Sequence, residues 1–145
     1  MTSEASVWRK EYSIETTATP EAIWRLFSEV PGWKHWNAGI EEIQITGPFA
    51  AGTEFHMKPP GQETLTSRLV EVRVNEVFVD ETRIEDLTVR VTHRIETLPG
   101  SSRTRIVYAA EAIGPGCEEV GPLVSADFPE VLKNLVALAE ASLPV

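Results

Sequence analysis

The sequence has 145 residues, of which 42% are apolar and 24% charged, as in an ordinary soluble protein. Thirteen Lys and Arg residues against 22 Asp and Glu residues give a net charge of −9, and the absence of a basic cluster argues against nucleic acids and anionic membranes as partners. We expect one domain over residues 1–145, without membrane insertion, because no apolar run approaches the roughly 18 residues that a membrane helix needs.

Two further features indicate the cytoplasm. The stretch Met1–Ser6 lacks the basic and then apolar pattern of a secretion signal. Cys117 is the only cysteine, so an internal disulfide is excluded.

The N-terminal third predicts a strand followed by two short helices. Val7–Thr17 alternates, with Trp8, Tyr12 and Ile14 on one face. Thr19 and Pro20 suit the cap and the first position of a helix whose apolar residues recur at helical spacing. Pro31-Gly32 is expected to end that helix, and Trp33–Trp36 to form a second one.

The middle of the chain predicts a six-stranded antiparallel meander. Short turn sequences rich in Pro, Gly, Asn and Asp separate most of its strands. The predicted strands are Ile40–Thr46, Thr53–Lys58, Glu63–Val74, Val77–Ile84, Leu87–Leu98 and Ser102–Ile113. In Glu63–Val74 the apolar parity changes from Leu65 and Leu69 to Val70, Val72 and Val74, which indicates a β-bulge and leaves the facing of Glu71 and Arg73 open.

The chain ends in an amphipathic helix. Its predicted apolar stripe consists of Phe128, Val131, Leu132, Leu135, Leu138 and Ala139. A curved antiparallel sheet needs its concave face covered, and this helix is the one predicted element long enough to cover it. The sequence therefore predicts an α+β helix-grip fold: a strand, two helices, six strands and a long helix gripped by about seven strands.

The predicted turns fix which side chains share a face. A two-residue turn at Glu85-Asp86 pairs Ile84 with Leu87 and Phe78 with His93. If the next turn spans Pro99 to Ser102, His93 lies opposite Tyr108.

The outer face supports the same register. It places Glu96 opposite Arg105, and Arg90 opposite Glu111, so opposite charges face each other. The inner face is apolar except for a few polar groups, of which Asp80, His93 and Tyr108 are the most notable.

Short motifs along nearly the whole chain resemble those of a known superfamily. They are Thr19–Trp24, the Trp33 and Trp36 pair, Ile40–Ile45 with Gly47-Pro48-Phe49 and Gly52-Thr53, His93-Arg94, Thr104–Ile106, Gly114-Pro115 and the closing Leu132, Leu135 and Leu138–Glu140. Together with the element order, they resemble the START-like or Bet v 1-like (SRPBCC) helix-grip superfamily, in particular its polyketide cyclase/dehydrase branch.

The resemblance implies a hydrophobic cavity between the sheet and the long helix. Relatives use such cavities to bind lipids, sterols, hormones or aromatic polyketides, and some catalyse ring closure or dehydration. No invariant catalytic motif defines the branch, so no catalytic residue is carried over by position.

Three functions stay open. The first is binding of a lipid-like or aromatic molecule whose polar atom is oriented by Asp80, His93 and Tyr108. The second is a cofactor-independent cyclase or dehydratase, in which the same three residues act as acid and base on an enolisable carbonyl. The third is an interaction module like the heat-shock ATPase activators of this fold, although no charged docking stripe is visible. The three groups can also simply satisfy one another inside the sheet.

The ligand-lining residues expected besides these three come from the tryptophan pair, the inner sheet face and the final helix. They are Trp33, Trp36, Phe55, Met57, Ser67, Phe78, Thr82, Val91, Phe128 and Leu132. His35 and His56 are expected at the surface, with His35 at an entrance as the alternative, and the three histidines lack metal-ligand spacing. We expect no metal, no cofactor and a monomer or homodimer.

Overall fold

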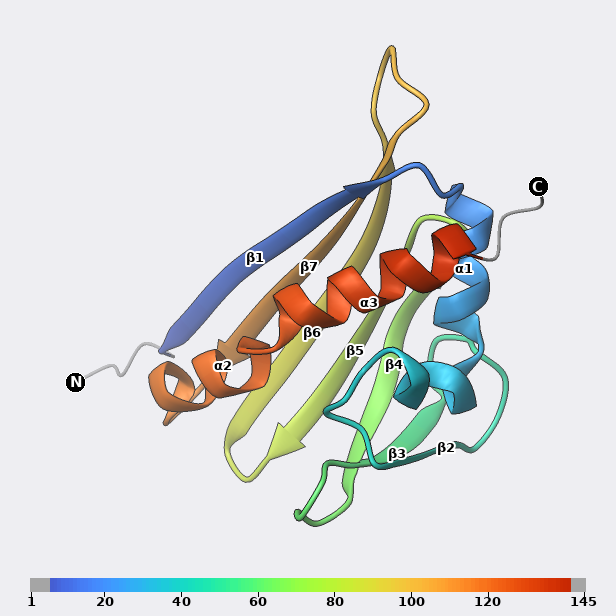
Figure 1. Cartoon of the computed structure of the whole chain (residues 1–145). Coiled ribbons are helices and arrows are strands. Elements are labelled where there is room, and N and C mark those ends of the chain that lie inside the picture. Colours follow the sequence, from blue (N-terminus) through green and yellow to red (C-terminus); the bar gives the residue numbers. More distant parts are fainter. Residues whose placement is uncertain (1–5, 142–145) are drawn as a thin grey trace.

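The computed structural model describes residues 6–141 (Figure 1). Its strands are β1 (Val7–Thr16), β2 (Glu42–Ile45), β3 (Glu54–Lys58), β4 (Leu65–Arg73), β5 (Val77–Ile84), β6 (Leu87–Thr97) and β7 (Thr104–Ile113). Its helices are α1 (Pro20–Ser28), the 3₁₀ helix η1 (Val30–His35), α2 (Cys117–Ser125) and α3 (Phe128–Ala141). The predicted element order is confirmed, with one further helix, α2, between β7 and α3.

The seven strands form one antiparallel sheet in the order β1-β7-β6-β5-β4-β3-β2. Figure 1 shows α3 running across one face of this sheet, from α2 toward α1. This is the helix-grip arrangement predicted from the sequence. We call the face that the helices cover the inner face, and the opposite face the outer face.

The predicted strand register is confirmed. Phe78 pairs with His93, and His93 pairs with Tyr108. The outer face carries the expected opposite-charge pairs Glu96–Arg105 and Arg90–Glu111.

The predicted bulge in β4 is also present. The pairing with β5 steps from Leu69–Asp80 to Glu71–Val79, so Val70 is left without a partner strand residue. Leu69 is fully buried, whereas Glu71 and Arg73 are exposed and form an ion pair of 2.8 Å. The bulge therefore accounts for the parity change seen in the sequence.

Helix α1 begins as predicted but ends earlier. The Thr19 hydroxyl accepts a hydrogen bond of 3.2 Å from the Ala22 amide, and Pro20 opens the helix. The helix stops at Ser28 because Glu29 leaves the helical region, with φ −91° and ψ 73°. The predicted stop Pro31-Gly32 lies inside η1 instead, since a proline fits the first turn of a new helix.

The buried side of α3 differs from the predicted apolar stripe at two positions. Leu138 is 39% exposed, whereas Val136 is buried. The i, i+4 pairs Leu132–Val136 and Leu135–Ala139 set the buried side of the helix. Within residues 6–141, no helix is long and apolar enough to cross a membrane.

Candidate ligand-binding site

Three aromatic side chains meet on adjacent strands at the middle of the inner face. His93 of β6 is flanked by Phe78 of β5 and Tyr108 of β7 through direct cross-strand pairing. The His93 ring stacks on Phe78 with centroids 3.8 Å apart, and it meets Tyr108 edge to face at 4.6 Å. His93 and Tyr108 are only 8% and 3% exposed, so both polar side chains are largely desolvated.

One hydrogen bond orients the His93 ring. Its Nδ1 lies 3.1 Å from the Phe78 carbonyl, which can only accept, so Nδ1 carries the proton. Burial lowers the pKa of His93 to about 3, although the bond to Phe78 opposes this shift. The ring is therefore neutral at ordinary pH, and its Nε2 has a free lone pair.

Asp80 lies next to that lone pair. Its Oδ2 is 3.9 Å from His93 Nε2, beyond hydrogen-bond distance, and its side chain is 15% exposed. Burial raises the pKa of Asp80 to about 7. Since His93 is neutral, the two residues do not form an ion pair, and Asp80 is partly protonated near neutral pH. Desolvation thus outweighs mutual attraction in both groups.

The bulge in β4 lies directly beside Asp80. Leu69, the last residue before the register shift, is its partner on β4. Bulges redirect neighbouring side chains and are frequent next to functional sites. The sequence pattern had indicated the bulge, but not that it adjoins Asp80.

The hydroxyl of Tyr108 has no hydrogen-bond partner among the described residues, although it is buried. The indole Nε1 of Trp36, which is 4% exposed, is in the same state. Burial raises the pKa of Tyr108, and the nearby Asp80 adds to this shift. Both side chains therefore present a hydrogen-bond donor without an acceptor in an apolar interior, which native proteins rarely tolerate without a ligand or a water molecule.

Aromatic rings occupy the space around these groups. Phe27 of α1 lies 4.9 Å from Phe78, 5.9 Å from His93 and 6.4 Å from Tyr108, measured between ring centroids. Phe128 of α3 contacts Tyr108 from the other side at 5.3 Å. An open cavity at this position remains a prediction.

Comparison with known proteins shows the family of the chain. The family model described as polyketide cyclase / dehydrase and lipid transport matches residues 8–140. The chain belongs to this family. No curated protein matches its sequence.

Solved structures share the fold of this family member at low sequence identity. Norcoclaurine synthase from Thalictrum flavum, in complex with dopamine and hydroxybenzaldehyde, is 18% identical, with a TM-score of 0.75 over 97% of this chain and 91% of that one. The Zhui aromatase/cyclase from Streptomyces sp. R1128 is 15% identical, with a TM-score of 0.75 over 93% and 94%. A START superfamily protein from Mycobacterium smegmatis is 16% identical, with a TM-score of 0.72 over 92% and 97%.

The other residues expected to line the site lie in three kinds of surroundings. Phe78, Phe128 and Trp33 belong to the ring cluster around His93 or contact it directly. Val91 and Leu132 are buried in the core, Phe55 contacts Trp33 at 5.4 Å, and Met57 is half-buried. Ser67 and Thr82 form a cross-strand hydrogen bond of 2.5 Å, so these two hydroxyls satisfy each other.

Sequence reasoning had not included Phe27 or Tyr12 in the site. Phe27 is one of the apolar residues at helical spacing in the first predicted helix, and the sequence pattern gave no indication that it lies next to His93. Tyr12 lies opposite Tyr108 on β1 and donates to or accepts from Ser125 at 2.9 Å. The pairing of the first strand with the last would have revealed Tyr12, because it brings their inner faces together.

The remaining histidines lie outside this cluster. His35 is exposed, as predicted, and His56 contacts Thr66 at 3.0 Å across β3 and β4. Among residues 6–141, no group of three or more His, Cys, Asp or Glu side chains is arranged to hold a metal ion.

Proposed function

We propose that this protein binds a small hydrophobic molecule on the inner face of its sheet, and that Tyr108 donates a hydrogen bond to an oxygen atom of that molecule. The observation that carries the proposal is the buried Tyr108 hydroxyl without a partner. A carbonyl or ether oxygen of a ligand supplies the missing acceptor, while the rings of Phe27, Phe78 and Phe128 contact its apolar body. Membership of a family described as polyketide cyclase / dehydrase and lipid transport supports the same function.

The ring cluster implies that ligand entry moves side chains. Phe27 and Phe128 contact Tyr108 from α1 and α3, so a ligand reaches the hydroxyl when at least one of these rings shifts. Trp24 and Trp36 contact Phe27 at 6.3 and 6.4 Å. Tryptophan fluorescence therefore reports such a shift.

Native mass spectrometry of freshly purified protein tests the proposal. We expect an added mass that disappears on denaturation and corresponds to an uncharged, largely apolar compound. If no such mass is found, titration with an aromatic ketone, followed by tryptophan fluorescence, provides the second test. Protein that carries no compound and binds no aromatic ketone or lipid-like probe would overturn the proposal.

A specific observation also favours a cyclase or dehydratase as a second candidate function. The neutral His93 has its free Nε2 3.9 Å from Asp80, whose pKa of about 7 allows both protonation states near neutral pH. Of this pair, Asp80 suits the removal of a proton beside a ketone and its return to a leaving hydroxyl, because its pKa lies near neutral pH, whereas the neutral His93 can accept a hydrogen bond from the substrate at Nε2. No cofactor is needed for these steps.

The second candidate function has its own test. With a flexible polyketone as substrate, Asp80→Asn should lower kcat by roughly a hundredfold or more while ligand binding is largely kept. Unchanged turnover in this variant would eliminate Asp80 as the acid or base.

A further inference from the structure

Strand β1 forms one edge of the sheet. In the described chain it pairs only with β7, along ten residue pairs from Val7–Ile113 to Thr16–Thr104. At ten residues it is long for an edge strand, and an edge strand of this length exposes many backbone groups that can pair with another strand.

The backbone groups that β1 leaves unpaired can be assigned. The Gly114 amide donates to the Ser6 carbonyl at 2.8 Å, so Ser6 and every second residue after it pair their backbone groups with β7. On the other side of β7, the Leu98 amide donates to the Arg103 carbonyl at 3.2 Å. Arg103 and every second residue after it therefore pair their backbone groups with β6, and the residues between them pair with β1, in agreement with the assignment from Ser6. The amides and carbonyls of Val7, Arg9, Glu11, Ser13 and Glu15 therefore point away from the sheet.

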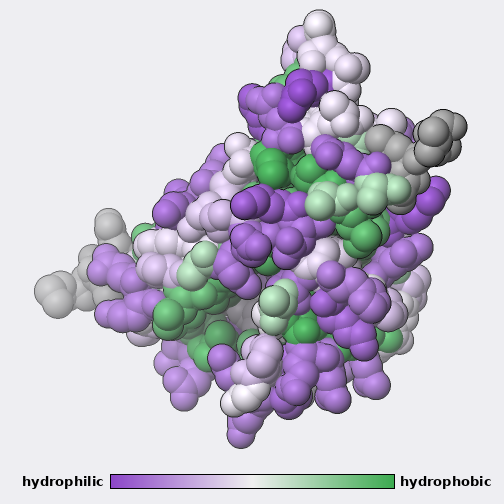
Figure 2. Space-filling view, in the orientation of Figure 1, coloured by the Kyte–Doolittle hydropathy of each residue, from purple (hydrophilic) through white to green (hydrophobic). Residues whose placement is uncertain are grey.

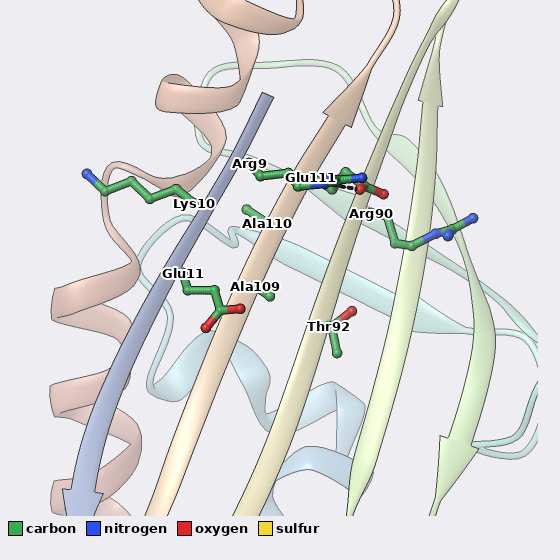
Figure 3. A pocket seen from close by; sticks show the side chains of 8 residues that line it. All are labelled: Arg9, Lys10, Glu11, Arg90, Thr92, Ala109, Ala110 and Glu111. Carbon is green, nitrogen blue, oxygen red and sulfur yellow. Dashed lines mark hydrogen bonds and ion pairs between the residues drawn. The ribbon is translucent and has the colours of Figure 1, made fainter. Parts of the chain in front are cut away.

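The outer face carries two rows of alternating charge that end at this edge. One row runs across the strands from Glu81 through Arg90 and Glu111 to Arg9. Figure 3 shows Arg9 and Glu111 joined in this row, with Arg90 beside them, and the Arg9–Glu111 ion pair measures 2.6 Å. The row ends in a positive charge on β1.

The second row ends in the opposite charge. It runs from Glu96 through Arg105 to Glu15, with Arg105–Glu96 and Arg105–Glu15 distances of 3.8 Å. Arg9 and Glu15 are both exposed, with side chains 72% and 45% accessible.

The two rows end on β1 at Arg9 and Glu15, which carry opposite charges and lie three residues to either side of Tyr12. A two-fold axis at Tyr12 therefore brings each of them opposite the other in a second copy of the chain. An antiparallel partner β1 centred there brings Arg9 opposite the partner's Glu15, and Glu11 opposite the partner's Ser13. All four of these residues have outward backbone groups, so the same register that matches the charges also pairs the amides with the carbonyls. We propose that two copies of this chain pair through β1, antiparallel and centred on Tyr12, to form one continuous sheet.

Apolar surface lies at the same edge. Val7, at the start of β1, is 44% exposed, and Leu123 of α2 is 77% exposed. Figure 2 shows apolar residues gathered over α2, beside the start of β1. A partner strand paired along β1 would lie beside this apolar surface.

Lys10 is the residue on β1 that could prevent two copies from pairing. It lies on β1 between Trp8 and Tyr12, with its ammonium 5.0 Å from the centroid of the Tyr12 ring. A lysine at such a place can also protect an edge strand from pairing. A chain that stays monomeric would assign Lys10 this protective role and would overturn the proposal.

Sedimentation of the whole chain, without ligand and from micromolar to submillimolar concentration, tests the pairing. We expect a dimer of twice 16.1 kDa for the natural sequence. Arg9→Glu and Glu15→Arg should each raise the dimer Kd by at least about tenfold, because each places like charges opposite each other at two symmetric positions.

Mixing the two variants gives the decisive result. In a mixed pair, the new glutamate at position 9 faces the new arginine at position 15, and the natural Glu15 of the first variant faces the natural Arg9 of the second. Opposite charges therefore meet at both positions, and equal amounts of the two variants should form a heterodimer although each alone is largely monomeric. Ser13→Pro should also abolish the dimer without unfolding the monomer, since the lost amide points outward. A dimer that persists in these variants, or variants that do not associate on mixing, would overturn the proposal.

Discussion

Asp80 and His93 lie side by side on the inner face, yet burial moves their pKa values in opposite directions. The folded protein holds the proton on Asp80 up to about pH 7 and keeps it off His93 down to about pH 3. The raised pKa of Asp80 therefore contributes to the free energy of unfolding in full below pH 3.8, relative to high pH. This contribution is lost as the pH rises to about 7. For His93 the contribution is present above pH 6.5 and is lost as the pH falls toward 3.

Asp80→Asn should separate these two effects. Between pH 4 and 6.5 the two contributions offset each other in the natural protein, since each changes the free energy of unfolding by about 1.4 kcal/mol per pH unit at most. Without Asp80, the His93 contribution is unopposed. Relative to the natural protein, the variant should gain free energy of unfolding steadily from pH 4 to pH 7.

Urea unfolding at several pH values measures this difference. Thr82→Val, on the same strand and the same side, is the control and should give an offset that does not depend on pH. A constant offset for Asp80→Asn as well would mean that Asp80 is ionised throughout.

The Tyr108 hydroxyl should contribute nothing to the stability of the ligand-free protein. Tyr108→Phe removes a buried hydroxyl without a partner, so we expect an unchanged free energy of unfolding, or an increase of up to about 1 kcal/mol. Tyr12→Phe is the matched control, because its hydroxyl contacts Ser125 at 2.9 Å, and it should cost about 1 kcal/mol. Equal losses in urea unfolding would show that Tyr108 has a partner in the free protein.

Among the secondary-structure elements, α2 depends on one close contact with β1. A Cβ atom added to Gly121 would lie 2.2 Å from Cε3 of Trp8, so no side chain fits between the helix and the ring. Gly121→Ala should therefore lower the free energy of unfolding by about 1–3 kcal/mol in thermal or urea unfolding. Gly32→Ala is the control: its added atom meets only His35, at 3.8 Å. Similar losses in both variants would contradict this account of α2.

The strands were more predictable than the site. A two-residue turn and a period of two fix the register of β5, β6 and β7, and these rules act over short distances. The end of α1 was misjudged because both a helix stop and the start of a new turn can contain Pro31-Gly32. Sequence pattern also placed Asp80, His93 and Tyr108 on one face.

The sequence could not predict which polar side chains have a hydrogen-bond partner in the folded protein. Whether Ser67 is satisfied by Thr82, or Tyr108 left without a partner, depends on ångström-scale distances between strands and helices. The same holds for Phe27, which reaches His93 only because α1 crosses the sheet at this point.

For the whole molecule, the outer face carries paired charges and the inner face carries buried donors and rings. Several Arg and Glu side chains of the outer face lie in cross-strand ion pairs, such as Arg90–Glu81 at 2.7 Å. The inner face instead holds the Tyr108 hydroxyl, which has no such partner in the described chain. This contrast is the reason why we propose the interior, rather than the charged face, as the small-molecule site.

The most direct test compares two ligands of nearly equal shape. Acetylnaphthalene carries a ketone oxygen, and ethylnaphthalene lacks it. By tryptophan fluorescence, the natural protein should bind the ketone roughly tenfold more tightly or better, and Tyr108→Phe should abolish this preference while keeping the affinity for the hydrocarbon. Equal affinity of the natural protein for both compounds, or a preference that survives Tyr108→Phe, would contradict the assignment of the Tyr108 hydroxyl as the ligand's hydrogen-bond donor.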